Sequence, residues 1–353
     1  MRVAIVGFPY AGKTTLFRAI SGVSPDHLKI AEENLAAVHV PEPRLDWLEA
    51  HFKPRKRTEA TIDFVDLPGS GEGDLEKAGL EKHLPTLRQA DALVLCVRAF
   101  ASDSVPAFKG SVDPQRDLEL IRQEMLYADF AIVAGRVEKL EKAITKPSKE
   151  RDQQKHELEL LRRCNDALEK GRPLSAVIQP GEEEKMVRSF GFLTQKPVVT
   201  VVNIGEADIR RETIVRDENA VFTLAACAPV EADILQLPRA DRPAFMAEYG
   251  ISALARDRII RACFDALGLI VMLTAGPEEV RAWPLNRGTT AVEAAGKIHT
   301  DLARGFIKAE TVAFDDLRAT GSMRDAKAAN KVRLEPKGYV IQDGDVVLIK
   351  FSV

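Results

Sequence analysis

The sequence predicts an α/β protein with a parallel sheet, which is interrupted by an inserted pair of helices and followed by a β-rich module. Short apolar strands alternate with helical segments in residues 1–120 and again in 190–275, and this alternation is typical of a parallel sheet. Between these parts, residues 121–189 show long helical patterns with heptad spacing. Residues 276–353 return to strand-like patterns. Because 353 residues exceed one ordinary core, we expect these parts to form separate domains.

The elements of the α/β part follow from local patterns in chain order. Residues 2–6 are apolar and β-branched, and a glycine follows them, so we expect a strand. A helix is expected to begin near Gly12 and to end by Gly22. Residues 23–34 show no clear period and are expected to form a loop. The further strands are expected at residues 36–40, 61–66, 92–97, 198–203 and 220–226, and the further helices at 44–51, 76–88 and 251–267.

The inserted helices are predicted from apolar side chains that recur at steps of four and three residues, a period near 3.5. The first helix carries Leu126, Phe130, Val133, Val137, Leu140 and Ile144 along this seam. The second carries Leu158, Leu161 and Leu168 on one face, after a break at Pro147 and Ser148, and stops at Gly171. Two such helices predict an antiparallel coiled-coil hairpin. Its outer residues are dense in Lys, Arg and Glu, which are either simply solvated or bind a partner.

The last module is expected to begin after residues 275–277. Its strands are expected at residues 308–314, 339–341 and 346–351, around one helix at 291–300.

Composition favours a soluble protein without zinc or disulfides. The hydrophobic content of 45% and charged content of 29% are ordinary, and a net charge of -3 gives no basic excess. No apolar run approaches the roughly 20 residues that span a bilayer, and no signal peptide pattern follows Met1. The four cysteines form no CxxC pair and are expected to be reduced thiols of a cytoplasmic protein; they are Cys96, Cys164, Cys227 and Cys263.

A phosphate-binding loop is predicted at residues 7–14, where Gly-Phe-Pro-Tyr-Ala-Gly-Lys-Thr fits the pattern GxxxxGK[ST] between a strand and a helix. The motif wraps backbone N–H groups around phosphates at a helix N-terminus, where the helix dipole also favours an anion. Lys13 is expected to reach the β- and γ-phosphates, and the Thr14 hydroxyl to bind Mg²⁺. The nucleotide-binding residues expected here are Pro9, Tyr10, Ala11, Gly12, Lys13, Thr14 and Thr15.

A second element of the site is predicted where the strand at residues 61–66 ends. Asp66 begins the run Asp-Leu-Pro-Gly, and an aspartate there can hold Mg²⁺, usually through water. The Gly69 N–H can approach the γ-phosphate. The competing interpretation is an ordinary turn, but the position after a buried strand favours the site.

The segment after the strand at residues 198–202 is expected to recognise the nucleobase. Many P-loop NTPases carry NKxD there, whose Asp accepts hydrogen bonds from guanine, whereas this chain has Asn203-Ile204-Gly205-Glu206. Ile204 replaces the Lys, and Glu206 replaces the Asp with a longer side chain. Because a site built to pair one base edge discriminates strongly, guanine preference should be weakened. We expect adenine nucleotides to bind at least as well as guanine nucleotides.

These parts together resemble the YchF, or Obg-like ATPase, family. The phosphate loop reads GFPxxGKTTLF, and residues 203–206 supply NxxE. The C-terminal module is the most specific part, with Arg-Ala-Trp at residues 281–283, AAGKIHTD at 294–301, GFIKAE at 305–310 and QDGDV at 342–346. The resemblance covers essentially the whole chain.

The resemblance implies a TRAFAC-type P-loop NTPase: a G domain with a coiled-coil insertion and a C-terminal β-grasp domain of the TGS type. It implies ATP and Mg²⁺ binding, with Asn203, Ile204 and Glu206 at the base, and with Ala226 and Cys227 in a nearby loop. Members are thought to be regulatory NTPases that act on the ribosome or in stress responses. Their TGS and helical domains offer surfaces for ribosome or RNA contact, and a monomer is implied.

The chain also departs from the family pattern. Tyr10 stands where the family has Asn, and Ile30 stands where its switch I has a Thr that completes the Mg²⁺ shell. Ile has no oxygen to offer a hard cation. Residues 99–114 lack the histidine that the family links to hydrolysis, and Ser70 follows Gly69 where the family has an apolar residue. These departures mark a divergent member in which binding is retained and hydrolysis is weak.

The resulting hypothesis is a regulatory switch that binds and slowly hydrolyses ATP, or GTP, and docks on ribosome or RNA. Lys13, Asp66 and Gly69 are its expected catalytic residues. The alternative is a nucleotide-binding scaffold with little or no hydrolysis. A metabolic kinase is disfavoured because the sequence shows no Arg-rich lid. The six histidines have no metal spacing and are expected to be structural, with a catalytic role for His83 as the alternative.

Overall fold

The computed structural model divides into two compact units, each described here by itself. The first unit comprises Met1–Ala37 and Asp63–Cys263, and the second comprises Val38–Ile62 and Phe264–Val353. The structure describes residues 1–29, 32–68, 80–145, 147–211 and 215–352.

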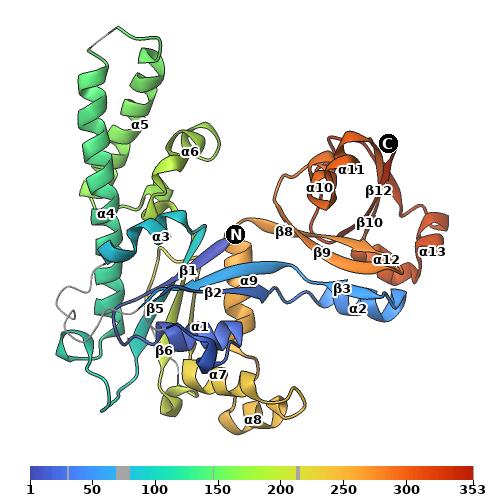
Figure 1. Cartoon of the computed structure of the whole chain (residues 1–353), viewed down its shortest axis with the longest axis horizontal. Helices are drawn as coiled ribbons and strands as arrows, with labels where there is room; N and C mark the ends of the chain where they lie inside the picture. Colours follow the sequence, from blue (N-terminus) through green and yellow to red (C-terminus); the bar gives the residue numbers. More distant parts are fainter. Residues whose placement is uncertain (30–31, 69–79, 146, 212–214, 353) are drawn as a thin grey trace. The chain divides into compact units, whose positions relative to one another are not determined.

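A six-stranded sheet forms the centre of the first unit, in the order β2-β4-β1-β5-β6-β7 (Figure 1). The pairs β1–β4, β1–β5, β5–β6 and β6–β7 are parallel, as the sequence predicted. The central strands are predominantly apolar because a parallel sheet is covered on both faces, and every residue of β6 is buried. The strands are β1 (Arg2–Val6), β2 (Asn34–His39), β4 (Thr61–Asp66), β5 (Ala92–Ala99), β6 (Val198–Ile204) and β7 (Phe222–Ala226).

Helices cover this sheet, and α1 (Lys13–Ser21) and α7 (Ala228–Gln236) lie side by side (Figure 1). Of the helix expected at residues 76–88, the described part is a 3₁₀ turn, η3 (Leu80–His83), followed by α3 (Leu84–Gln89). Three further helices of this unit are α6 (Glu182–Val187), α8 (Arg242–Tyr249) and α9 (Ala255–Ala266), the last of which crosses into the second unit. The other 3₁₀ turns are η1 (Pro25–His27), η4 (Phe108–Gly110), η5 (Leu174–Ala176), η6 (Arg188–Phe190), η7 (Leu193–Gln195) and η8 (Glu206–Asp208).

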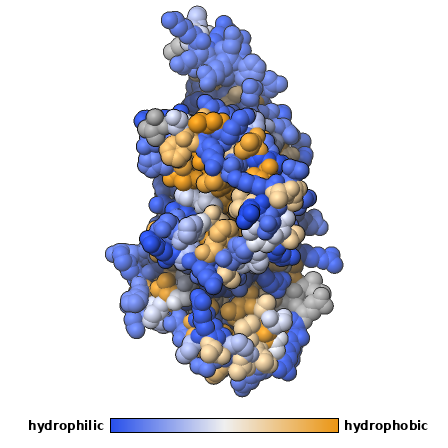
Figure 2. Space-filling view, turned by 90° about the vertical axis from the view of Figure 1, so that its right-hand side faces the viewer, coloured by the Kyte–Doolittle hydropathy of each residue, from blue (hydrophilic) through white to orange (hydrophobic). Residues whose placement is uncertain are grey.

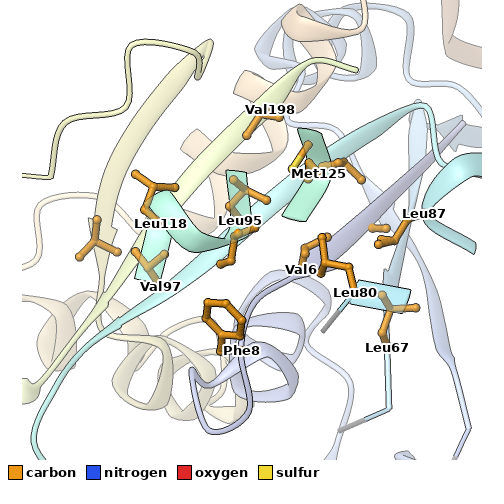
Figure 3. Packing of buried hydrophobic residues seen from close by; sticks show 14 of the residues in the cluster. Val6, Phe8, Leu67, Leu80, Leu87, Leu95, Val97, Leu118, Met125 and Val198 are labelled. Carbon is orange, nitrogen blue, oxygen red and sulfur yellow. The ribbon is translucent and has the colours of Figure 1, made fainter. Parts of the chain in front are cut away.

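One apolar core lies beneath the loops at the end of this sheet. Val6 and Phe8, from the end of β1 and the loop after it, pack with Leu80 and Leu87 from the segment that follows the predicted γ-phosphate region (Figure 3). Met125 joins them from the long helix α4 (Pro114–Ala143). The phosphate loop therefore rests on the same core that holds η3, α3 and α4.

The predicted helical hairpin is present as α4 and α5 (Arg151–Glu169). Its seam is confirmed because Val133 and Leu140 pack in one cluster with Leu158, Leu161 and Leu168. Across the hairpin Arg136 forms a bidentate pair with Glu157, with N–O distances of 2.7 and 2.8 Å. The hairpin is inserted between β5 and β6, which remain neighbours in the sheet. Its tip is almost entirely hydrophilic in Figure 2.

The second unit is built on another six-stranded sheet, in the order β11-β10-β12-β8-β9-β3, with mixed pairing. Ile270, Met272, Ala294 and Val347 belong to the core between this sheet and α10. The strands are β3 (Lys56–Thr58), β8 (Leu269–Ala275), β9 (Glu279–Asn286), β10 (Phe306–Ala313), β11 (Arg333–Glu335) and β12 (Asp345–Phe351). The helices are α2 (Pro43–Phe52), α10 (Ala291–Ile298), α11 (Thr300–Arg304), α12 (Phe314–Thr320) and α13 (Met323–Ala328).

Residues 38–62 belong to the second unit, although the sequence analysis grouped them with the first domain. β3 pairs in parallel with β9, and Lys56 stands opposite Glu279. Leu45 and Leu48 of α2 are fully buried. Residues 264–275 likewise lie in the second unit because they contain β8. Both differences from the expected boundaries arise from strand pairing between distant parts of the chain.

The expectation of a strand at residues 339–341 is wrong. This described segment forms an isolated bridge between Thr290 and Val340 instead. The segment is apolar because Ile341 fills the core, at 2% exposure, while the Tyr339 hydroxyl donates to Asp345. The neighbouring expectations at 308–314 and 346–351 are confirmed by β10 and β12.

The surface is mixed: Figure 2 shows hydrophobic patches set among hydrophilic residues. In the second unit the exposed large apolar side chains include Ile307, Leu334, Leu348 and Phe351. Within the described part of the chain, no helix combines the length and the apolar character that a membrane span requires.

Candidate nucleotide-binding site

The predicted phosphate loop connects β1 to α1, which is the context that its motif requires. Gly12 precedes the helix with φ 88°, a left-handed conformation that glycine adopts without steric penalty. A Cβ on Gly7 would lie 2.3 Å from the carbonyl oxygen of Cys96, so the loop passes too close to β5 for any side chain there. The first turn of α1 closes with the Leu16 N–H donating to the Gly12 carbonyl over 2.8 Å. The two glycines therefore set the path of the loop.

Tyr10 also adopts a positive φ, 61°. This conformation costs an L-residue other than glycine roughly 1–2 kcal/mol. Asparagine tolerates the left-handed region better than tyrosine does because its short polar side chain can hydrogen-bond locally. The departure noted at this position therefore adds backbone strain within the loop.

Lys13 is the half-buried cation of the site. Its Nζ donates to the Phe8 carbonyl over 3.1 Å, which folds the side chain back over the loop. Burial lowers the pKa of the Lys13 ammonium, and interactions with Cys96 and Asp66 partly oppose this shift. Desolvation of this kind strengthens the attraction of the ammonium for a phosphate.

Asp66 ends β4 beside Lys13 and is 1% exposed. Burial raises the pKa of its carboxyl, while the Thr14 hydroxyl, the Asn34 amide and the charge of Lys13 favour the ionised form. Its Oδ2 accepts a hydrogen bond from Asn34 Nδ2 over 3.3 Å. Its Oδ1 is buried and makes no hydrogen bond with the residues that the structure describes.

These residues fit a nucleotide-bound Mg²⁺. Burying a carboxylate oxygen destabilises a protein unless the oxygen accepts a hydrogen bond or binds a metal ion. Thr14 is exposed at the start of α1 and close enough to influence Asp66. Mg²⁺ keeps several waters and completes its octahedral shell with substrate phosphates. Thr14 and Asp66 are thus suitable protein groups when a phosphate is present.

Asn203, at 1% exposure, joins the phosphate loop to the segment after β7. Its Nδ2 donates to the Ala11 carbonyl over 2.9 Å, and its Oδ1 accepts from the Ala228 N–H over 3.2 Å. A Cβ on Gly12 would meet Asn203 Nδ2 at 2.2 Å. The structure therefore brings together the phosphate loop, Asn203 and the junction of β7 and α7, where Ala226 and Cys227 lie.

The other residues expected at the base are placed differently from one another. Glu206 begins the turn η8 and is exposed. Ile204 is 5% exposed and belongs to the apolar core beneath the site. Ala226 and Cys227 are each 4% exposed, and burial raises the pKa of the Cys227 thiol. Only Glu206 of this set offers a solvent-accessible polar group.

The sequence analysis did not single out Phe100 or Asn34. The Phe100 ring lies 3.8 Å from the position of a Cβ on Gly12, and its Cβ lies 3.6 Å from that on Gly205. Phe100 therefore stands between the phosphate loop and the Asn203–Glu206 segment, with the Arg98 guanidinium 4.6 Å from its ring centroid. The sequence signal that could have identified Phe100 is an aromatic residue shortly after the strand predicted at residues 92–97.

His83 lies at the end of η3, half-buried. Burial lowers its pKa, the positive charge of Lys13 acts in the same direction, and a backbone hydrogen bond with Pro68 opposes them. The interaction with Lys13 indicates that His83 lies near the phosphate loop. Gly69, Ser70 and Ile30 lie outside the described residues.

Comparisons with known proteins show which family the chain resembles over its whole length. A family model described as "50S ribosome-binding GTPase" matches residues 2–134, and YchF-GTPase_C, described as "Protein of unknown function (DUF933)", matches 269–352. The ribosome-binding ATPase YchF of Bacillus subtilis (strain 168) is 37% identical, over 100% of both chains. Obg-like ATPase 1 of Oryza sativa subsp. japonica is 34% identical over 100% of this chain and 92% of its own. The solved structure of the Schizosaccharomyces pombe YchF GTPase has a TM-score of 0.85 and 28% identity, over 99% of this chain and 97% of its own.

Proposed function

Because this chain belongs to the YchF, or Obg-like ATPase, family, we propose that it is a regulatory P-loop NTPase that binds ATP with Mg²⁺ and hydrolyses it slowly. The observation that carries the proposal is the pairing of the phosphate loop with a buried carboxylate at the end of β4. Lys13 and Asp66 interact electrostatically, and Asp66 Oδ1 accepts no hydrogen bond from the residues that the structure describes.

In this proposal each part of the loop has a distinct role. Backbone N–H groups of residues 10–15, which follow Pro9, and the N-terminus of α1 hold the phosphates. Lys13 would neutralise the β- and γ-phosphates, and Thr14 and Asp66 would hold Mg²⁺. When bound, the metal neutralises charge that develops on the phosphates. Gly69 is the further backbone donor expected from the sequence.

We propose that the base binds beside Asn203, Glu206 and the junction of β7 and α7, where Ala226 and Cys227 lie. Glu206 is the exposed carboxylate there, and a carboxylate accepts hydrogen bonds from an amino group such as that of adenine. Phe100 offers an aromatic ring beside the same segment. This arrangement favours adenine at least as much as guanine.

The proposed partner is the ribosome or its RNA, because relatives of similar length are named ribosome-binding ATPases. The hydrophilic hairpin of α4 and α5 and the TGS-like C-terminal module are the proposed docking surfaces, on a cytoplasmic monomer. The test is co-sedimentation of the purified protein with ribosomes in ADP, in a non-hydrolysable ATP analogue and without nucleotide. Nucleotide-dependent sedimentation supports the switch, and identical sedimentation in all three states contradicts it.

Phosphate release decides between the switch and a scaffold that binds nucleotide without turnover. The strain at Tyr10 and the absence of histidine from residues 99–114 favour the scaffold as the second candidate. Mg²⁺-dependent phosphate release that Lys13→Ala abolishes would establish hydrolysis at this site. Release that is undetectable in protein that binds ATP would favour the scaffold.

A further inference from the structure

Asn34 is a buried amide at the start of β2, in a position where its neighbours Glu32 and Glu33 are exposed. At 8% exposure its side chain must satisfy its polar atoms within the protein. Its Oδ1 accepts from the Lys29 N–H over 2.8 Å, and its Nδ2 donates to the Lys29 carbonyl over 3.0 Å. The same Nδ2 donates to Asp66 Oδ2 over 3.3 Å.

The network fixes the orientation of this amide. A backbone N–H can only donate, so the Lys29 N–H requires the Asn34 oxygen to face it. The NH₂ group is then directed to the Lys29 carbonyl and to Asp66, which are both acceptors. Neither Asp nor Leu can replace this arrangement, because both lack the two donors. An Asp would also place a second carboxylate beside Asp66, where like charges repel.

The contact selects which oxygen of Asp66 remains available. Oδ2 is held by Asn34, whereas Oδ1 is buried and makes no hydrogen bond with the described residues. A carboxylate held at one oxygen cannot rotate freely, so the other oxygen keeps a fixed direction. Groups that orient a metal-binding carboxylate through hydrogen bonds commonly change metal affinity by 10- to 100-fold when removed.

We propose that Asn34 is a positioning residue for the Mg²⁺ site, which ties the loop ending at Lys29 to the carboxylate of Asp66. The inference rests on the proposed function, since it names a residue that serves the metal of the bound nucleotide. It also gives the loop before β2 a link to the metal site that does not pass through residue 30, where this chain has Ile. Loop position and metal binding are therefore coupled through one buried amide.

The first test measures ATP affinity by calorimetry in Mg²⁺ and in EDTA. The dissociation constant in EDTA divided by that in Mg²⁺ is called the Mg²⁺ ratio, and it reports the contribution of the metal to ATP affinity. Asn34→Ala is expected to reduce this ratio about tenfold, while the dissociation constant in EDTA stays within about twofold of wild type because Asn34 does not belong to the phosphate loop. The exposed Asn219→Ala is the matched control and should leave both constants unchanged.

A second pair of variants avoids the buried position. Lys29→Pro removes the backbone N–H that donates a hydrogen bond to Asn34 Oδ1, whereas Lys29→Ala retains this N–H. Leu28 is extended, with φ −84° and ψ 138°, so it is compatible with a following proline. Lys29→Pro should lower the Mg²⁺ ratio in the same direction as Asn34→Ala, and Lys29→Ala should not.

The outcomes separate the two proposals. Wild-type protein that binds no nucleotide would overturn the proposed function. If wild type binds ATP more tightly in Mg²⁺, an undiminished ratio in Asn34→Ala or in Lys29→Pro would overturn the role of Asn34. An equal loss of affinity in Mg²⁺ and in EDTA would assign Asn34 a structural role only and would likewise overturn it.

Discussion

The guanidinium of Arg88 lies against the fully buried carboxylate of Asp129, with Nη1 and Oδ1 3.3 Å apart. This contact joins α3 to α4, and Arg88 also donates to the Ala128 carbonyl over 3.1 Å. Asp129 accepts from the backbone N–H groups of Leu193 and Thr194 over 3.0 and 2.8 Å. The segment after the predicted γ-phosphate region is therefore tied to the base of the helical hairpin.

Replacing Arg88 by Ala should destabilise the first unit. The variant leaves a buried carboxylate without its cation, a change that typically costs about 3–5 kcal/mol. Burial already raises the pKa of Asp129, and the charge of Arg88 partly opposes this shift. Loss of Arg88 would therefore raise the pKa of Asp129 further. Asp129 can then protonate more readily at low pH, so the loss of stability should be larger at pH 8 than at pH 5.

Chemical unfolding of Arg88→Ala and wild type at the two pH values checks this prediction. Arg136→Ala, which removes a more exposed pair on the hairpin, is the control. An equal effect of the two substitutions, or an Arg88→Ala effect that grows as pH falls, would contradict it.

Gly12 and Asn203 should be energetically coupled. Gly12→Ala places a Cβ 2.2 Å from Asn203 Nδ2 and also strains a backbone at φ 88°. In an Asn203→Ala background the clash disappears, and only the backbone strain of roughly 1–2 kcal/mol remains. A double-mutant cycle on thermal unfolding should therefore show non-additivity. If the changes in stability caused by the two substitutions were additive, Gly12 and Asn203 would not be in contact, and the prediction would be contradicted.

Local signals explain what the sequence predicted well. β1, the glycines of the loop and Lys13 lie within one short stretch, so spacing alone identified them. The heptad seam of the hairpin is equally local, and its packing is confirmed. The contacts of Asn203 with Ala11 and Ala228 could not be read in this way, because they join the end of β6 to the phosphate loop and to the start of α7, which are far apart in the sequence.

Glu231 should make stability depend on pH between about 4.5 and 7. It is 5% exposed, it accepts from the Arg256 N–H over 3.2 Å, and burial raises its pKa from 4.5 to about 7. The folded state thus holds the proton more tightly than the unfolded chain, so stability falls as pH rises through this window. A shift of this size corresponds to at most ~3 kcal/mol.

Glu231→Gln tests the effect because it keeps the shape and an acceptor oxygen but cannot ionise. Relative to wild type, the variant should gain stability from pH 4.5 to pH 8, as measured by unfolding at several pH values. A constant difference across this range would show that Glu231 does not titrate in it.

The C-terminal residues alone should not form the second unit. Residues 264–353 lack β3 and α2, whose Leu45 and Leu48 are fully buried. They also lack Arg44, whose Nη1 donates to Asp343 over 2.8 Å. A fragment of 264–353 should unfold without cooperativity, whereas the same fragment joined through a flexible linker to 38–62 should show a cooperative transition. Cooperative unfolding of the shorter fragment would contradict this account.

This division also shows where sequence patterns fail. β3 is three residues long and polar throughout, and its partner β9 lies more than two hundred residues away. No local period marks such a strand. Asn34 was placed in a loop for the same reason, since its buried position depends on contacts with Asp66 and with the backbone of Lys29.

Calorimetric titration with ATP and with GTP, each in Mg²⁺, tests the central claim that the loop from Gly7 to Thr14 binds an adenine nucleotide. The account predicts that ATP binds at least as tightly as GTP, and that Lys13→Ala removes binding of both. Tight binding of GDP or GTP without measurable binding of ATP would contradict it.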